Sequence, residues 1–449
     1  MPDSKEEYIY TFKNMENDEI KVFLPKFEID METMKQIKHM SEHSILRNIR
    51  IMPDCHRGHG CCVGLTAFID NKIFPRYVGV DIGCGISMYP LNIKFKRKKI
   101  PKVEELIRAK IPMGIEKNEC NQVTEDDWEW LTYANTRDLN NLKNRISDKY
   151  PDYKFPETLD FNYIKQILLK IGCKFETDIK SIGSLGGGNH YVEINTADSD
   201  NEDNIENYIT VHSGSRHIGL QICTYHQGII DKNSTFDWAK FNDELVKLYR
   251  KTKGNKVRKQ IKDELFEKMK SELRPKYLEG HEMIDYLIDM IVGQNLASLN
   301  RAVMIRNVVS NLSLDPFNRD VIIETRHNYI DFDRFIMRKG AISAEKDEPC
   351  IISLNMKEGV LLCRGKGDPD WNYSSAHGCG RILSRTSAGR LNMKVFTKEM
   401  ENVYSTCVRK ETLDESPMAY RDVELIKKCI TGNVVVLKQL KPLINCKGF

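Results

Sequence analysis

The chain alternates between two patterns of hydrophobic and polar residues. Short apolar or β-branched runs interrupted by glycine dominate residues 45–95, 180–230 and 320–385, which is typical of strands joined by tight loops. Stretches with apolar residues at helical spacing lie between these segments. The sequence therefore predicts a protein in which strand-rich and helix-rich segments follow one another.

Two regions are predicted to be mainly helical. Residues 101–175 contain helices with a polar surface and are expected to form a peripheral subregion. Residues 236–312 form the longest helical block. Within this block, residues 249–259 are strongly basic. They could follow an RNA backbone, or they could be a solvated helix face that the following acidic residues balance.

Composition indicates a compartment but no activity. The 449 residues carry a net charge of +4 with 29% charged residues, which is too mild to indicate nucleic-acid binding by itself. Thirteen cysteines without a regular framework argue against a secreted disulfide scaffold and favour a reducing compartment. The N-terminus lacks a signal-peptide pattern, and no apolar run approaches the ~18 residues of a membrane-spanning helix. We therefore expect a cytoplasmic protein without a membrane partner.

The segment Val78-Gly-Val-Asp81-Ile-Gly-Cys84-Gly85 carries candidate metal chemistry. It ends an apolar run with a carboxylate and a thiol among glycines, which permit a backbone path that aims both side chains at one point. Asp81 and Cys84 offer one hard and one softer donor to a divalent transition metal. The D-x-x-C spacing is common, so this segment alone also fits a purely structural turn.

Three histidines occur in a similar context further along the chain. His190, His212 and His327 each lie at the edge of an apolar or β-branched run, beside glycine, serine or asparagine. Each is predicted to lie at a strand terminus, where side chains of adjacent strands can converge on one cavity. Any one of them could have a structural role, but the three together with Asp81 and Cys84 favour a metal centre.

His377 has a different setting. It lies in the small-residue segment Tyr373-Ser-Ser-Ala-His377-Gly-Cys-Gly-Arg381, which a phosphate could approach closely. Histidine can form covalent intermediates, and an arginine can neutralise phosphoryl oxygens as charge develops. The segment could equally be a surface loop in which the glycines only turn the chain.

Taken together, these segments resemble the tRNA-splicing ligase RtcB family, and its bacterial branch in particular. The resemblance covers roughly residues 45–449 and rests on the number, order and spacing of its motifs. They are Met52-Pro-Asp-Cys-His-Arg-Gly58, Gly79-Val-Asp-Ile-Gly-Cys-Gly85, Leu185-Gly-Gly-Gly-Asn-His190, His212-Ser-Gly-Ser-Arg216, Asn300-Arg301, His327-Asn328, Arg338-Lys-Gly-Ala341, His377-Gly-Cys-Gly-Arg381, Pro417-Met-Ala-Tyr420 and Cys446-Lys-Gly-Phe449.

The resemblance implies an α+β fold, with one RtcB-like catalytic domain over residues 1–449 and central mixed or antiparallel sheets flanked by helices. The implied enzyme is an RNA ligase that depends on GTP and on two Mn²⁺ ions per site. It joins a 3'-phosphate or 2',3'-cyclic phosphate end to a 5'-hydroxyl end through a guanylylated histidine, in tRNA splicing or RNA repair. RNA and GTP are the implied partners, and an archease-type activator is a further candidate.

The resemblance also assigns roles to individual residues. His377 matches the histidine that becomes guanylylated. The positions that match metal ligands, with the thiolate shared by both ions, are Asp81, Cys84, His190, His212 and His327. The positions that match nucleotide contacts, with the glutamate reading the guanine edge, are Asn189, Glu193, His327, Asn328, Asn355, His377, Gly378, Gly380, Tyr420 and Lys447. The basic positions near the phosphates are Arg216, Lys339 and Arg381. The mixed ligand set favours manganese over magnesium but leaves zinc and cobalt open.

One loop departs from the family pattern. Family members usually have Pro-Gly-Ser-Met-Gly before the guanylylated histidine, whereas this chain has Ser353-Leu-Asn-Met-Lys357. Asn355 replaces a serine that contacts nucleotide, and Leu354 and Lys357 replace glycines that could require a positive φ. An alternative therefore stays open, a metal-dependent phosphodiesterase or phosphatase that has lost guanylylation. A noncatalytic RNA-binding relative is a third, weaker interpretation.

Overall fold

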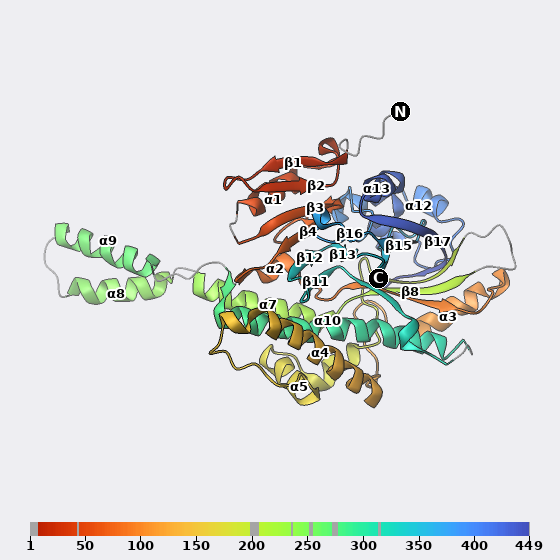
Figure 1. The fold of residues 1–449 in the computed structure, drawn as a ribbon, viewed down its shortest axis with the longest axis horizontal. Coiled ribbons are helices and arrows are strands. Elements are labelled where there is room, and N and C mark those ends of the chain that lie inside the picture. The colour runs from red at the N-terminus through yellow and green to blue at the C-terminus, as the bar shows by residue number, and fades with distance from the viewer. Residues whose placement is uncertain are drawn as a thin grey trace.

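The structure is a computed structural model, and it describes residues 8–42, 45–197, 206–234, 237–250, 255–271, 277–312 and 316–448. Figure 1 shows β-sheets at the centre, long helices along one side of them, and a helical hairpin that stands away from the rest. Helices combined with mixed and antiparallel sheets confirm the predicted α+β class.

Two large sheets form the centre of the molecule. The first contains one parallel pair, its second and third strands, and is otherwise antiparallel. In spatial order its strands are β1 (Tyr10–Lys13), β2 (Glu19–Val22), β3 (Arg47–His56), β4 (Val63–Phe68), β12 (Ile336–Lys339) and β11 (Asn328–Asp331). The second sheet is antiparallel throughout. In spatial order its strands are β10 (Ile323–Arg326), β6 (Gly85–Leu91), β8 (Asn207–Ser213), β7 (Tyr191–Ala197), β17 (Val434–Cys446), β15 (Val360–Gly365) and β14 (Pro349–Ser353).

The second sheet brings distant parts of the chain together. Strand β17, at the C-terminal end, lies between β7 and β15, and β10 pairs with β6. Strands β6, β7 and β8 are buried along most of their length, which explains why their sequences read as apolar runs rather than as alternating patterns. Two small sheets, each of two strands, complete the β-structure: β13 (Ala341–Ser343) with β16 (Ser374–Ala376), and β5 (Lys72–Ile73) with β9 (Leu278–Glu279).

Helices cover the sheets and connect them. They are α1 (Met31–Ser41), α2 (Pro75–Val78), α3 (Ile100–Lys110), α4 (Glu125–Ile146), α5 (Phe161–Lys170), α6 (Phe175–Asp178), α7 (Arg216–Ser234), α8 (Trp238–Arg250), α9 (Asn255–Ser271), α10 (Gly280–Val309), α11 (Arg385–Ala388), α12 (Met393–Glu399) and α13 (Val423–Ile430). In Figure 1, α4, α5, α7 and α10 lie together along one side of the sheets.

Helix α10 is the central helix of the fold. Most of its 30 residues are buried, because it packs against α4 and α7 on one side and against β6 and β8 on the other. A helix that is apolar on nearly all sides is expected in the interior of a large protein. Its partners position it directly behind the strands that carry the predicted metal ligands.

The two regions predicted to be helical differ in their packing. Residues 101–175 contain α4 and α5, and their buried residues join the same core cluster as α10. Residues 236–312 contain both α10 and the protruding hairpin of α8 and α9. The division into subregions stays a prediction. Part of the basic segment 249–259, residues 251–254, lies outside the described residues. Within the part of the chain that the structure describes, no helix is long and apolar enough to cross a membrane.

Candidate active site

The five predicted metal ligands lie at the ends of neighbouring strands. Asp81 and Cys84 come from the loop between α2 and β6, His190 directly precedes β7, His212 lies near the end of β8, and His327 separates β10 from β11. They converge because β6 begins opposite the end of β8 on one side and the end of β10 on the other. The prediction that His190, His212 and His327 lie at strand termini is confirmed by their positions.

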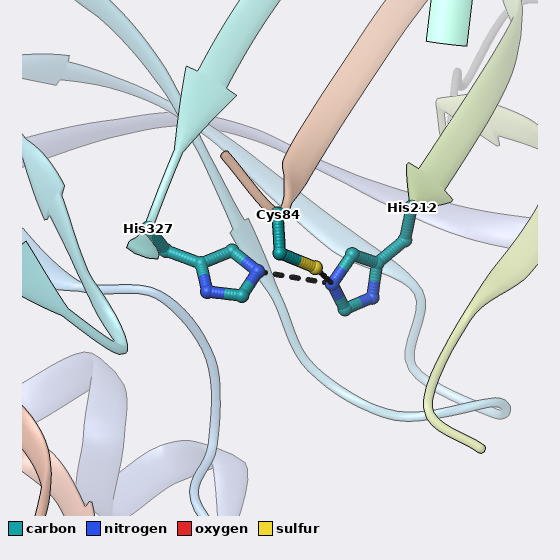
Figure 2. A group of neighbouring side chains, drawn as sticks. All are labelled: Cys84, His212 and His327. Atoms are coloured by element: carbon teal, nitrogen blue, oxygen red, sulfur yellow. Dashed lines mark hydrogen bonds between the residues drawn. The ribbon is translucent and has the colours of Figure 1, made fainter. Parts of the chain in front are cut away.

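Cys84, His212 and His327 form one group of donor atoms, which Figure 2 shows at the ends of three different strands. Cys84 Sγ lies 3.4 Å from His212 Nε2, and His212 Nε2 lies 3.0 Å from His327 Nε2. All three side chains are buried, and their donor atoms lie within 4.8 Å of one another. Two imidazoles and a thiol at this spacing can hold a transition-metal ion.

Asp81, Cys84 and His190 form a second group, which shares the thiol with the first. Cys84 Sγ lies 3.4 Å from His190 Nε2, and this nitrogen lies 2.9 Å from Asp81 Oδ2. His190 Nδ1 lies 2.9 Å from the carbonyl oxygen of Leu185, a contact that orients the imidazole. One sulfur between two sets of donors is the arrangement that a thiolate-bridged pair of cations would need.

Two glycines allow the close approach of these groups. A Cβ atom on Gly214 would lie 2.0 Å from Asp81 Oδ1. Gly83 has a φ of +70°, and a Cβ atom there would lie 2.8 Å from the Cα of Gln294 in α10. Side chains at either position would push the carboxylate or the whole loop out of place.

Burial determines the charge of the cluster. It lowers the pKa of His212 and of His327 well below the ordinary value, and neighbouring imidazoles lower it further, so both rings are neutral and suited to bind a cation. Burial also raises the pKa of the Cys84 thiol well above its ordinary value, and Asp81 adds to the shift. A divalent cation would reverse the shift of the thiol, because its charge favours the thiolate.

The Asn300-Arg301 motif of α10 fixes the loops that carry the ligands. Asn300 Oδ1 accepts a hydrogen bond from the Gly183 N–H at 2.7 Å, and its Nδ2 donates to the Gly214 carbonyl at 2.9 Å. Arg301 donates to the carbonyls of Gly83 at 2.9 Å and of Ser213 at 2.6 Å. Both side chains are fully buried, so one turn of α10 holds the Asp81–Cys84 loop, the loop before His190 and the end of β8.

His377 directly follows β16 and is held by a carboxylate that we did not predict. Its Nδ1 lies 2.5 Å from Asp54 Oδ2, in β3, and the same oxygen accepts hydrogen bonds from the N–H groups of His377 and Gly378, each at 3.0 Å. Asp54 is fully buried. The His377 ring lies 4.7 Å, centre to centre, from that of His327. Asp54 thus places the imidazole beside the metal-ligand cluster.

Two cavities meet at His377. The larger, of about 710 Å³, is lined by most of the predicted nucleotide-binding residues, including Asn189, Glu193, Tyr420 and Lys447. The smaller, of about 200 Å³, is lined by Asp81, His327, Asn328 and Lys339 among others. His56, His59, Asn189 and His377 line both cavities. A nucleotide in the larger cavity would therefore have its phosphates next to the metal-ligand cluster.

The larger cavity contains a buried carboxylate. Asn195 Nδ2 donates to Glu193 Oε2 at 2.8 Å, and Asn445 Nδ2 donates to Oε1 at 2.7 Å. Asn445 reaches this position because it lies opposite Glu193 in the β17–β7 pair. Burial raises the pKa of Glu193 to about 7, although the two amides and Lys447 favour its charged form. A carboxylate with one lone pair left on each oxygen can accept two parallel N–H donors.

A second buried carboxylate orients the lysine and the tyrosine. Lys447 Nζ lies 3.4 Å from Glu415 Oε2, and the Tyr420 hydroxyl donates to the same oxygen at 2.7 Å. Burial would raise the pKa of Glu415, but Lys447 and Arg385 outweigh it and lower the pKa to about 2. We did not predict Asn445 or Glu415, because neither belongs to a motif that suggests chemistry on its own.

The three predicted basic residues are in different positions. Arg381 lines the larger cavity, and it donates to the Asp414 carbonyl at 2.6 Å and to Glu415 Oε1 at 3.1 Å. Lys339 lines the smaller cavity, where its ammonium donates to the carbonyls of His59 and Arg76. Arg216 lies elsewhere, because its guanidinium donates to Gly114 O at 2.8 Å and to Ser184 Oγ at 3.2 Å, next to the loop before His190. We therefore interpret Arg216 as a support of that loop.

The loop that departs from the family pattern is not strained. Leu354 and Lys357 do not have positive φ; Gly359, with a φ of +72°, takes the left-handed position instead. Leu354 is buried in a core cluster, and the Lys357 ammonium lies 2.8 Å from Glu399 Oε2. Asn355 Oδ1 accepts from the backbone N–H groups of Lys357 and Glu358, each at 3.0 Å, so it closes the turn. The two replaced glycine positions therefore need no positive φ here, since the turn is built from Asn355 and Gly359.

The remaining predicted residues have close backbone contacts. Asn328 lines the smaller cavity, and its side chain links the Asp81 carbonyl, at 3.3 Å, to the Gly340 N–H, at 3.0 Å. Cβ atoms on Gly378 and Gly380 would lie 2.6 Å from Ser353 O and 2.2 Å from Asp54 O, respectively. The glycines after His377 thus let this segment pack directly against β3 and the altered loop.

Comparison with known proteins identifies the family. A family model described as tRNA-splicing ligase RtcB matches residues 35–448. The chain belongs to the RtcB family. It is 26% identical over 460 aligned positions to the RNA-splicing ligase RtcB of Escherichia coli (strain K12), with 98% of this chain and 100% of that protein covered. It is also similar to the tRNA-splicing ligases RtcB of Methanococcus maripaludis (25% identity, 88% and 87% covered) and Thermococcus kodakarensis (24%, 96% and 98%). The family resemblance inferred from the motifs is confirmed.

Proposed function

We propose that this RtcB protein is an RNA ligase that uses GTP and two manganese ions and that forms a covalent guanylyl–His377 intermediate. One observation carries the proposal: His377 lies where a cavity with a buried Glu193–Asn445 pair meets a cavity lined by Asp81 and His327, one residue from each group of metal donors. The names of the relatives, RNA-splicing and tRNA-splicing ligase, support the reaction class.

The donor set fits a pair of divalent cations. A carboxylate, a thiol and three imidazoles converge in two groups that share Cys84, and this combination suits manganese better than magnesium. Zinc and cobalt would also fit the imidazoles and the thiol. The residues that would hold the ions are Asp81, Cys84, His190, His212 and His327. Bound ions would neutralise charge on the triphosphate and on the departing pyrophosphate.

The contact with Asp54 selects the nucleophilic nitrogen of His377. With its proton on Nδ1, facing the carboxylate 2.5 Å away, the imidazole has its lone pair on Nε2. Nε2 attacks the α-phosphorus of GTP, a P–N bond forms, and the bond from the α-phosphorus to the β-phosphate oxygen breaks with release of pyrophosphate. Asp54 then stabilises the positive charge that develops on the ring.

The larger cavity supplies nucleotide recognition. Glu193, in its ionised form, would accept the N1–H and N2–H donors of guanine, while Asn195 and Asn445 hold the carboxylate in place. Tyr420 and Lys447, both held by Glu415, lie in the same cavity and are suited to contact the ribose and phosphate.

Two further transfers complete the reaction. An oxygen of the RNA 3'-phosphate attacks the guanylyl phosphorus, and the P–N bond to His377 breaks, which gives an RNA end activated by guanylate. The 5'-hydroxyl then attacks the RNA phosphorus, loses its proton and expels GMP. A 2',3'-cyclic phosphate end must first be hydrolysed to the 3'-phosphate. The joined RNA has an ordinary phosphodiester.

The phosphodiesterase alternative is not favoured. It depended on a disrupted Ser353–Lys357 loop, yet this loop forms an unstrained turn, and Ser353 packs beside His377 through a hydrogen bond from its N–H to the His377 carbonyl at 2.9 Å. A hydrolase would have no use for the buried Glu193 set. Dependence on an archease-type activator, the identity of the RNA and a cytoplasmic location stay predictions.

Labelling with α-³²P-GTP tests this proposal. The purified protein, incubated with labelled GTP and Mn²⁺, should yield a labelled band on a denaturing gel, and the bond should be acid-labile and base-stable, as expected for a phosphoramidate. His377→Ala should remove the label, whereas His281→Ala, which changes an exposed histidine on α10, should retain it. Label on the His377 variant would show that another residue is the nucleophile. No label on the wild type, with hydrolysis of a cyclic phosphate end, would support the phosphodiesterase.

A further inference from the structure

We infer that the hairpin of α8 and α9 is an RNA-binding arm, which contacts the phosphate backbone of the substrate beyond the ends that react. The inference rests on the proposed function, because it takes RNA as the substrate. Figure 1 shows the two helices side by side and apart from the rest of the molecule.

The arm is held together by its own small core. Phe241 of α8 packs with Leu265 and Met269 of α9, and Leu245 and Phe266 extend this cluster. All these residues belong to α8 or α9. The inner faces of the two helices are thus used to pair the helices with each other, and their outer faces are available to a partner.

The charge of the arm is concentrated at its outer end. Among the residues with described side chains, positions 247–250 and 257–262 include five lysines and arginines and no acidic residue, whereas the acidic residues lie at positions 237–244 and 263–264. Lys247 and Arg250 on α8, and Lys259 and Lys262 on α9, are exposed. Both pairs have i, i+3 spacing, which places their members on one side of each helix. A cluster of cations on a protruding element is suited to a polyanion.

The base of the arm lies near the rim of the active site. Arg76, which lines the smaller cavity, has its NH2 nitrogen 3.4 Å from Asp231 Oδ2, one turn before the end of α7. Helix α8 begins four residues after α7 ends. An RNA strand that leaves the smaller cavity past Arg76 therefore reaches the base of the arm first.

The length of the arm predicts how much RNA is needed. The 13 residues of α8 span about 20 Å at about 1.5 Å per residue. A stacked strand has one phosphate per roughly 3.4 Å, so about six nucleotides separate the base of the arm from its outer end. Short RNA ends would reach the catalytic residues only, and longer ends would also reach the cations.

RNA fits the arm better than a membrane or a protein partner. An amphipathic helix that inserts into a membrane needs a continuous apolar face, but the apolar side chains Phe241 and Leu245 of α8 pack against α9. Four large apolar residues of the arm are exposed: Trp238, Val246, Leu248 and Val257. The Trp238 ring packs against Phe241 and Phe266. Val246 and Leu248 flank Lys247, and Val257 lies between Lys256 and Arg258. Such scattered residues do not make a docking surface.

The test is a charge-reversal variant of the full-length protein, Lys247→Glu/Arg250→Glu/Lys259→Glu. Fluorescence anisotropy with a 30-nucleotide RNA should show at least about a tenfold weaker affinity at 100 mM salt. The slope of log K against log salt should fall by about two, since each lost phosphate contact on a single strand contributes about 0.7. The KM for 30-nucleotide RNA ends in joining should rise, and that for 5-nucleotide ends should stay unchanged.

The matched control is Arg97→Glu/Lys98→Glu/Lys99→Glu. These exposed cations directly precede α3, at the opposite end of the molecule in Figure 1, and the change in net charge is identical. The control should bind RNA within about threefold of the wild type. Equal losses in both variants, or no loss in the arm variant, would overturn the inference. Loss of binding to vesicles with anionic lipid, with RNA affinity unchanged, would overturn it in favour of a membrane.

Guanylylation separates this inference from the proposed function. The arm variant should be labelled by α-³²P-GTP as fast as the wild type, because the arm lies outside both cavities. If the wild type were not labelled, the proposed function would fail, yet the anisotropy comparison, which needs neither GTP nor Mn²⁺, would still decide whether the arm binds RNA. Slower labelling of the arm variant would show that the arm also affects guanylylation, which would contradict a role of the arm in RNA binding alone.

Discussion

At the scale of single residues, the structure assigns the orientation of His377 to a carboxylate on another sheet. Asp54 accepts two backbone hydrogen bonds and lies 2.5 Å from Nδ1 of the imidazole, so it fixes the position of the ring, and the proposed mechanism assigns the proton to this nitrogen. It lies in the Met52–Gly58 motif, which the resemblance included without a role. Its place in a motif shared with the family is the sequence signal that could have marked Asp54 as a partner of His377.

Asp54→Asn tests this arrangement. The amide can keep its oxygen on the two backbone N–H groups and beside Nδ1, but it removes the negative charge that would stabilise the imidazolium formed during the attack. We expect the rate of guanylylation to fall at least about a hundredfold while GTP binding changes little. Pre-steady-state labelling measures this rate, and Asp18→Asn, an exposed position, serves as control. An unchanged rate would show that Asp54 has only a structural role.

Glu193 predicts how guanylylation depends on pH. The proposed guanine contact requires the ionised carboxylate, and burial raises the pKa of Glu193 to about 7. We therefore expect kcat/KM for GTP to fall up to tenfold per pH unit below pH 7 and to level off above it. Glu193→Gln should weaken GTP binding and remove this dependence. A variant with the pH profile of the wild type would contradict the role of the carboxylate.

The raised pKa of Glu193 also makes the stability of the folded protein depend on pH, and here a rise in pH is unfavourable. The pKa of Glu193 is higher in the folded state than its ordinary value of 4.5, so ionisation destabilises the folded protein. Stability should therefore decrease as pH rises from about 4.5 to about 7, by roughly 3 kcal/mol from this group alone. Urea unfolding of the wild type and of Glu193→Gln at several pH values measures the difference.

At the scale of elements, one turn of α10 determines the geometry of the metal-ligand cluster. Arg301 is fully buried and donates to two loop carbonyls, and its guanidinium is paired with Glu324. Arg301→Met would leave these acceptors unpaired in the interior. We expect a loss of roughly 3 kcal/mol in the free energy of unfolding, together with a lower metal content.

Arg306→Met, on the same helix, is the matched control for this effect. Arg306 pairs with Asp127 and lies on the side of α10 that faces α4. Its replacement should lower the melting temperature without changing the metal content. Thermal unfolding and elemental analysis of both variants give the comparison. Equal metal contents in both variants would mean that Arg301 does not position the ligands.

Strand termini were predictable from the sequence, but strand order was not. The apolar runs that end at His212 and His327 indicated where candidate ligands lie along the chain. The pairing of β6 with both β8 and β10, which brings these termini together, depends on contacts between residues more than a hundred positions apart. The shape of the Ser353–Lys357 loop could not be predicted for a similar reason, because it depends on Gly359, which lies beyond the compared positions, and on the hydrogen bonds of Asn355.

At the scale of the whole molecule, the site unites segments from Asp54 to Lys447. The spread of the candidate site residues from Asp81 to Lys447 indicated that distant segments meet, and the family resemblance implied the α+β class. Partners such as Asn445 and Glu415 could not be predicted, because an isolated asparagine or glutamate is recognisable only when the strand that carries it is placed. The protruding arm was also unpredicted, since helical spacing does not show whether a helix is central, like α10, or exposed.

Metal binding should couple to global stability. Neutral imidazoles and a buried thiol are placed to bind a cation in the folded protein, whereas the unfolded chain would separate them. Removal of metal with a chelator should lower the melting temperature, and Mn²⁺ should restore it, with about 2.7 kcal/mol gained at a hundredfold excess over Kd. Cys84→Ala should reduce the bound metal from two ions to one or none. A Cys84 variant that still binds two ions would contradict a shared thiolate.

The most direct test of the account follows the phosphate through the reaction. An RNA with a ³²P-labelled 3'-phosphate is incubated with a 5'-hydroxyl RNA, GTP and Mn²⁺, and the products are treated with phosphatase and resolved by size. If the proposed mechanism is correct, the label enters a longer, phosphatase-resistant RNA. This transfer of label requires GTP, and His377→Ala abolishes it. Release of the label as inorganic phosphate, or joining without GTP, would contradict the account.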